Sequence, residues 1–128
     1  ASDVYKRQAC ITALNEGLEA PKYMNEAYIE RRDYLKAKLL SLGFELEAQP
    51  EGAFYIFPSI KRFTNNDFDF CVNVLEEAHV AMVPGSSFTD IGKGYIRISY
   101  AYEMNVLKEG MRRLELYLKE HYPNVLDN

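Results

Sequence analysis

The chain has 128 residues, of which 48% are hydrophobic and 13% aromatic, and this composition suits one globular domain. The formal net charge is −4, and lysine and arginine form no run longer than a pair, so a nucleic-acid partner is not expected. No apolar stretch approaches the ~20 residues that cross a bilayer, and the first residues lack the apolar segment of a signal peptide. Since Cys10 and Cys71 form no disulfide framework, we expect a cytoplasmic protein without a membrane partner.

Helical periodicity predicts two helices in the first third of the chain. Residues 8–17 are weakly helical, and residues 21–42 form a long helix with Pro21 at its first position, where a missing N–H costs nothing. Gly43 is a typical residue just beyond a helix end. The apolar face expected on the long helix comprises Met24, Tyr28, Leu35, Leu39 and Leu42.

Four strands and two more helices are predicted over the rest of the chain. Their order indicates an α+β fold, in which helices pack on one small mixed sheet. The strand at residues 53–57 is apolar throughout, so we expect it at the centre of the sheet. The expected strands cover residues 44–48, 53–57, 80–83 and 95–100, and the expected helices cover residues 67–78 and 103–119. The buried face predicted for the helix at 67–78 comprises Phe68, Cys71, Val72, Leu75 and Ala78.

Arg97 is the most informative residue of the sequence, because it interrupts the apolar run of the last predicted strand. Alternation along a strand places Tyr95, Arg97 and Ser99 on one face and the two isoleucines between them on the other. A guanidinium is costly to bury without a partner, and its planar fork suits two parallel hydrogen bonds to a carboxylate. The spacing alone also fits a plain alternative, in which Arg97 lies on a solvated face.

Two glycine-containing segments are candidates for ligand contact, although each also fits an ordinary turn. Pro84 opens a loop that continues Gly-Ser-Ser-Phe88, and such loops bring backbone N–H groups close to a ligand. Gly52 precedes an apolar strand, where a glycine permits a positive φ or a close approach by a ligand. His79 and His121 have no second metal ligand at the required spacing, so no metal site is expected.

These weak signals occur together and in one order. The segments are Pro-Glu-Gly-Ala-Phe-Tyr at residues 50–55, Val-Pro-Gly-Ser-Ser-Phe at 83–88 and Tyr-Ile-Arg-Ile-Ser-Tyr at 95–100. Together they resemble the C-terminal small domain of fold-type I, pyridoxal-phosphate-dependent aminotransferases of class I/II, and are most similar to the bacterial aspartate and aromatic aminotransferase branch. The resemblance extends over residues 8–117, which is nearly the whole chain.

The resemblance implies a role for three residues. Arg97 matches the arginine that binds the substrate α-carboxylate, Gly52 matches a glycine at the edge of the substrate pocket, and Phe88 matches a loop aromatic that faces the active site. It also implies amino-group transfer between an amino acid and a 2-oxo acid, with pyridoxal 5'-phosphate as cofactor and a homodimeric parent enzyme. The helix at residues 21–42 would then be the C-terminal part of the long helix that joins two domains.

The sequence also departs from the family pattern. It lacks the large domain, and with it the lysine that forms the Schiff base and most of the groups that hold the cofactor. We therefore expect residues 8–128 to be the small domain of a longer enzyme, inactive alone and without catalytic residues, and residues 1–7 to be a linker or non-native. Two alternatives stay open: a free-standing module that binds amino or keto acids, and the small domain of another fold-type I enzyme, such as a C–S lyase, a synthase or a decarboxylase.

Overall fold

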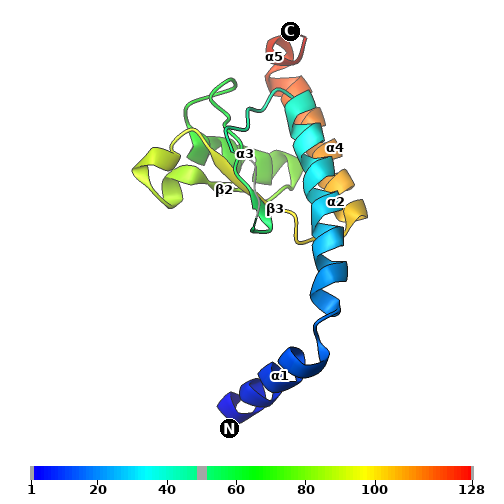
Figure 1. Ribbon diagram of the computed structural model, residues 1–128. Coiled ribbons are helices and arrows are strands. Elements are labelled where there is room, and N and C mark those ends of the chain that lie inside the picture. Colours follow the sequence, from blue (N-terminus) through cyan, green and yellow to red (C-terminus); the bar gives the residue numbers. More distant parts are fainter. Residues whose placement is uncertain (1, 49–51, 128) are drawn as a thin grey trace. The chain divides into compact units, whose positions relative to one another are not determined.

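The computed structural model describes residues 2–48 and 52–127, and contacts within the chain divide it into two units, Ala1–Glu30 and Arg31–Asn128 (Figure 1). The first unit holds helix α1, Ser2–Glu16, and the first half of helix α2, Ala20–Ser41. α1 begins at Ser2 instead of residue 8, and none of its residues is buried. The bounds of α2 agree with the predicted long helix to within one residue at each end.

The buried face of α2 is confined to the half that belongs to the second unit. Leu35 and Leu39 are fully buried and Leu42, just after the helix, is nearly so. Met24, which the periodicity places on the same face, lies in the first unit and is 56% exposed. The apolar spacing along α2 therefore predicts the buried positions of its second half but not of its first.

The sheet lies in the second unit and consists of three short strands in the described residues. They are β1, Tyr55–Ile56, β2, Val83–Pro84, and β3, Ile96–Ser99, in the order β1-β3-β2. Ile56 pairs with Ile98, and Val83 pairs with Arg97. The strand that carries the arginine is therefore the central one.

The α+β class is confirmed, and the sheet differs from the prediction in detail. The described pairings are all antiparallel, where a mixed sheet of about four strands was expected. The segment at 44–48 contributes only a single bridge, between Glu45 and Ser59, because Phe44 packs into the core and the residues after it are mostly exposed. The prediction that residues 53–57 form the central strand is wrong, since β3 pairs on both of its sides. Most of the predicted turn before that strand, residues 49–51, lies outside the described residues.

Helix α3 spans Asp67–Ala78, as the sequence predicts, but its buried face differs from the predicted one. Asn66 caps the helix, because its side-chain oxygen accepts the N–H of Asp69 at 3.0 Å. Phe68 was expected inside and is 58% exposed. The buried residues are Asp67, Phe70, Cys71 and Val74. The buried face is rotated relative to the predicted one and includes Asp67. Apolar periodicity does not count this carboxylate, which accepts hydrogen bonds on the inner side of the helix.

Helix α4, Met104–His121, lies beside the second half of α2 (Figure 1) and is followed by the short helix α5, Pro123–Leu126. An ion pair joins Lys38 to Glu115 at 2.7 Å, and the ammonium of Lys108 lies 5.8 Å from the ring centre of Tyr34. These contacts show that the two helices run in the same direction. Fully buried apolar side chains from helices and sheet form the core, at about 1.5–3 kcal/mol each. They include Leu35, Leu39, Ile56, Ile60, Val74, Ile96, Leu114 and Leu118.

Between β2 and β3 the chain makes two tight 3-10 turns, η1, Gly85–Ser87, and η2, Asp90–Gly92. The two turns contact each other, and η1 also contacts α3. This loop, residues 85–94, connects β2 to β3 and contacts the start of α3. Within residues 2–48 and 52–127, no helix is both long and apolar enough to cross a membrane.

Candidate functional site

Arg97 lies in the middle of the sheet, on the face turned away from the core. The two isoleucines of β3 are buried while Arg97 and Ser99 are half-buried, so the alternation predicted for this strand is confirmed. The guanidinium carbon of Arg97 lies 4.3 Å from the ring centre of Tyr55 and 4.4 Å from that of Phe88. Each such contact between a guanidinium and an aromatic ring is worth about 0.5–2 kcal/mol. The charged group is therefore held by rings from two different segments.

In the part of the chain that the structure describes, Arg97 makes no ion pair. The contrast with α4 is clear, because Arg112 and Arg113 both pair with Glu109, at 2.7 and 2.9 Å. The hydrogen bonds from these two arginines lower the pKa of Glu109 to about 2. Arg97 thus combines a fixed position with a charge that no described carboxylate neutralises. The carboxylate-binding role of Arg97 stays a prediction.

Four aromatic side chains surround this position, and we call them the aromatic wall: Tyr55, Phe57, Phe88 and Tyr95. Phe57 stacks on Tyr95 with ring centres 5.9 Å apart, and its ring centre lies 6.4 Å from that of Phe88. Phe57 and Phe88 are 40% and 47% exposed, which leaves apolar ring surface facing outward beside the guanidinium. Of these four residues, only Phe88 was predicted as a site residue, and Tyr95 was predicted on the same strand face as Arg97. Tyr55 and Phe57 alternate along the segment predicted as a strand, and this pattern could have identified them as neighbours on one face.

In the loop at 85–94, which contains Phe88, the backbones of two glycines lie in close contact. A Cβ built on Gly85 would collide with the carbonyl oxygen of Gly92, and a Cβ on Gly92 would collide with that of Gly85. The Gly85 N–H donates to the carbonyl oxygen of Tyr95 at 2.8 Å, and the Thr89 hydroxyl accepts the Gly92 N–H at 3.1 Å. Gly85 and Gly92 are therefore explained by the close contact between the two turns of the loop.

The carboxylate of Asp67, at the start of α3, is buried against the same loop, and the residue is only 2% exposed. Its Oδ2 accepts the Ser86 N–H at 2.8 Å, and its Oδ1 accepts the Gly94 N–H at 3.4 Å. Burial by itself would raise the pKa of Asp67, but the hydrogen bonds from Ser86 and Gly94 outweigh it and lower that pKa. Asp67 is therefore ionised at neutral pH although it is buried.

Gly52 lies at an exposed position before β1. Its φ is not in the left-handed region, and a Cβ built on it would meet no atom within 4 Å. The described residues therefore do not require a glycine here, and a close approach would have to come from a ligand or from another part of the protein. The role of Gly52 at the edge of a pocket stays a prediction.

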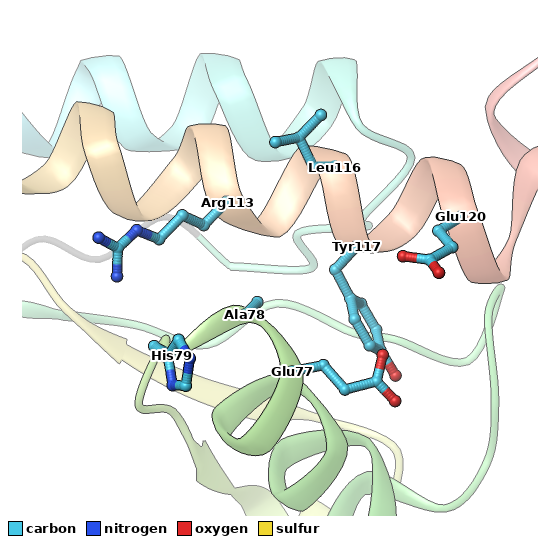
Figure 2. A pocket seen from close by; sticks show the side chains of 7 residues that line it. All are labelled: Glu77, Ala78, His79, Arg113, Leu116, Tyr117 and Glu120. Carbon is cyan, nitrogen blue, oxygen red and sulfur yellow. The ribbon is translucent and has the colours of Figure 1, made fainter.

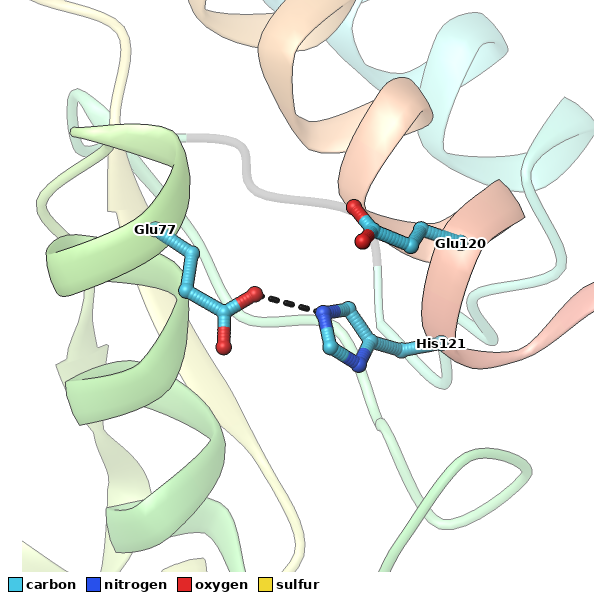
Figure 3. A group of neighbouring side chains, drawn as sticks. All are labelled: Glu77, Glu120 and His121. Atoms are coloured by element: carbon cyan, nitrogen blue, oxygen red, sulfur yellow. Dashed lines mark hydrogen bonds and ion pairs between the residues drawn. The ribbon is translucent and has the colours of Figure 1, made fainter.

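A second group of polar side chains gathers where α3 meets the last turns of α4 (Figure 2). Glu77, Glu120 and His121 each bring a possible metal-ligand atom to within 4.8 Å of the others (Figure 3). All three are exposed, and the His121 Nε2 lies 2.5 Å from the Glu77 Oε2, so a hydrogen bond explains the closeness of these two side chains. The nearby Tyr117 has its pKa raised to about 12, by burial first and then by the charges of Tyr122 and Glu77. Sequence spacing could not reveal this group, because Glu77 and His121 are 44 residues apart.

Comparison with known proteins identifies the family. A family model described as aminotransferase class I and II matches residues 5–114. A probable N-acetyl-LL-diaminopimelate aminotransferase of Bacillus subtilis (strain 168) is 46% identical over 112 residues, which cover 88% of this chain and 28% of that protein. Aromatic-amino-acid aminotransferase 2 of Thermococcus litoralis is 41% identical over 102 residues, which cover 80% of this chain and 26% of that protein.

The fold agrees with that result. The crystal structure of an aromatic aminotransferase from Pyrococcus horikoshii OT3 matches with a TM-score of 0.79 and 40% identity, over 83% of this chain and 28% of that one. The chain belongs to the class I and II aminotransferase family, and the resemblance stated from its motifs is confirmed. It spans little more than a quarter of the length of these relatives.

Family members of this kind bind the cofactor through a lysine that forms a Schiff base, as the resemblance implies, and the lysines of this chain do not suit that role. A lysine that forms a Schiff base is activated in a desolvated pocket or beside another cation. Within residues 2–48 and 52–127 no lysine is buried; Lys36 and Lys38 are half-buried, and Lys38 is paired with Glu115. The described part of the chain therefore lacks a residue suited to bind the cofactor covalently.

Proposed function

We propose that this chain is the C-terminal small domain of a pyridoxal-phosphate-dependent aminotransferase, in which Arg97 binds the α-carboxylate of the amino acid and of the 2-oxo acid. The observation that carries the proposal is the position of Arg97 on the central strand, where two aromatic rings hold it and no described carboxylate pairs with it. Membership of the family supports the class of reaction.

The chemistry of the site follows from the planar fork of the guanidinium. Two parallel N–H groups match the two oxygens of a carboxylate, and a charge-assisted contact of this kind contributes about 1.5–3 kcal/mol net. Because rings fix the guanidinium, the carboxylate would arrive in one orientation, and the bonds at its α-carbon would be oriented with it. The exposed rings of Phe57 and Phe88 would exclude water on that side and strengthen the pairing.

The remaining parts of the activity belong, in this proposal, to a longer protein that contains the chain, which we call the parent enzyme. Its cofactor would be pyridoxal 5'-phosphate, which supplies an electron sink for amino-group transfer when bound. The short coverage of the relatives and the unsuitable lysines support the assignment of cofactor binding to the rest of that protein. A pocket edge at Gly52, a homodimeric parent and a cytoplasmic location are further parts of the proposal.

The test is substitution of Arg97 in the parent enzyme. We expect Arg97→Ala to lower kcat/KM more than tenfold, which is about 1.4 kcal/mol of lost transition-state stabilisation. Arg97→Lys should lower it less, because an ammonium keeps the charge but loses the fork. The measurement is steady-state kinetics with L-aspartate or L-phenylalanine as donor and 2-oxoglutarate as acceptor.

Arg112→Ala is the matched control, because it removes an exposed arginine that pairs only with residues of its own helix. It should change kcat/KM less than about twofold. A loss below tenfold in Arg97→Ala would show that Arg97 does not bind the carboxylate. The alternatives have their own signatures: a free-standing binding module would bind the same amino acids in calorimetry of the 128-residue chain. Another fold-type I reaction would not convert the cofactor to its pyridoxamine form in a single turnover.

A further inference from the structure

Asp67 is an unusual residue for the interior of a small protein. Its carboxylate is buried, and in the described part of the chain no lysine, arginine or histidine pairs with it. A buried charge without a counter-ion is costly unless hydrogen bonds satisfy it. Its hydrogen-bond donors are neutral N–H groups, and those of Ser86 and Gly94 belong to one loop. The position of that loop is therefore tied to the carboxylate.

The two oxygens of Asp67 bind the two ends of the loop at 85–94. Oδ2 accepts the N–H of Ser86, near the first residue of the loop, and Oδ1 accepts the N–H of Gly94, its last residue. Close to these two anchor points the backbones of η1 and η2 also touch, at Gly85 and Gly92, so the two ends of the loop are held together. One side chain thus fixes a ten-residue segment at both ends.

This loop contains Phe88 and ends three residues before Arg97, so its position affects both side chains. Phe88, whose ring contacts the guanidinium at 4.4 Å, follows the first anchored residue, Ser86, by two positions. Arg97 itself follows the second anchored residue, Gly94, by three positions. A displacement of either end of the loop would change the distance between the guanidinium and the ring that holds it.

We propose that Asp67 is a positioning residue of this site, which holds the loop at 85–94 so that Phe88 and Arg97 keep the geometry needed to receive a carboxylate. The anchoring of the loop by Asp67 is inferred from the structure alone. The binding of a carboxylate at Arg97 rests on the proposed function. Asp67 is given no direct ligand contact in this proposal, because it is only 2% exposed and its carboxylate oxygens accept N–H groups of the loop.

The charge and both acceptor oxygens are needed for this role. Asp67→Asn keeps the shape of the side chain but turns an NH₂ group toward one of the two N–H donors, so one end of the loop loses its acceptor. Ser86→Ala is a milder variant, because it leaves the side chains of α3 unchanged and removes only the Ser86 hydroxyl, which helps to lower the pKa of Asp67. Asn66→Ala is the matched control, since it removes the N-cap of the same helix without touching the loop.

The experiment compares these variants in the parent enzyme by hydrogen exchange and by kinetics. In Asp67→Asn we expect peptides from residues 85–94 to exchange at least tenfold faster, and KM for the amino acid to rise at least fivefold with kcat within twofold. Ser86→Ala should move both readouts in the same direction by two- to threefold. Asn66→Ala should leave exchange of the loop and KM unchanged within twofold. The substrates are L-aspartate or L-phenylalanine with 2-oxoglutarate.

The outcomes separate this inference from the proposed function. Unchanged loop exchange in Asp67→Asn and Ser86→Ala would overturn the anchoring role whatever the kinetics show. Faster exchange with unchanged KM, in an enzyme where Arg97→Ala is strongly impaired, would overturn the positioning role and leave the carboxylate site standing. A KM increase of equal size in Asn66→Ala would also overturn it, because loss of helix stability alone would then explain the effect. If Asp67→Asn does not fold, Ser86→Ala decides.

Discussion

In the proposed site, aromatic rings hold the guanidinium of Arg97 without an ion pair from any described residue. Aromatic rings from β1 and from the loop at 85–94 hold it by cation–π contacts, which leave its N–H groups unneutralised by charge. A carboxylate in the same place would hold the side chain more strongly but would compete with the ligand. Holding the side chain with rings also reduces the entropy that is lost when a ligand binds.

At the same scale, the contribution of Phe88 can be measured. Phe88→Leu keeps an apolar side chain but removes the ring, so we expect carboxylate affinity to fall by about two- to fivefold, the equivalent of ~0.5–1 kcal/mol for an exposed cation–π contact. Inhibition of the parent enzyme by 2-oxoglutarate gives the affinity. Phe68→Leu is the control, since Phe68 is an exposed phenylalanine on α3. Equal effects of the two substitutions would contradict a specific role for the ring at 88.

At the scale of elements, the sequence predicts helices well because their signals are local. The bounds of α3 follow from the Asn66 cap and the two acidic residues of the first turn, and those of α2 follow from Pro21 and Gly43. The strands of this chain are predicted less well from the sequence, since β1 and β2 have only two residues each and their partners are distant in sequence. The inward turn of Asp67 could not be predicted, because the donors that satisfy it lie 19 and 27 residues further along the chain.

The C-terminal end of α3 offers a test of local backbone strain. His79 follows this helix in the left-handed conformation, with φ of 56°, which glycine adopts without penalty and other residues adopt at a cost of about 1–2 kcal/mol. We expect His79→Gly to raise the free energy of unfolding of the parent enzyme by about 1 kcal/mol, as measured by the urea midpoint. His79→Ala removes the same imidazole but keeps the strain, so it should give no gain. A gain in the alanine variant would point to the side chain instead of the backbone.

At the scale of the whole molecule, the chain consists of one unit with a core and one without. The described residues of the second unit supply every buried side chain of the core, whereas α1 has no buried residue. α1 nevertheless carries several exposed apolar side chains, which are Val4, Tyr5, Ile11 and Leu14. An isolated helix of its 15 residues is marginal in water, so we expect its stability to depend on contacts that cover these apolar side chains.

Hydrogen exchange of the 128-residue chain and of the parent enzyme tests this dependence. In the isolated chain we expect the amides of residues 2–16 to exchange within about tenfold of unfolded rates. In the parent enzyme they should exchange at least about a hundredfold more slowly, because the apolar face is then covered. Amides in the middle of α4, which packs in the core, serve as an internal reference and should be protected in both. Strong protection of α1 in the isolated chain would contradict the prediction.

The reciprocal contact of Gly85 and Gly92 limits how this loop can be redesigned. Each position has room for the carbonyl group of the other only because it carries no side chain. A substitution at one of them cannot be rescued at the other, since the partner is already the smallest residue. A library meant to alter ligand choice should therefore keep both glycines invariant, together with Thr89, whose hydroxyl accepts the Gly92 N–H. It should vary Ser87 and Phe88, whose side chains are exposed.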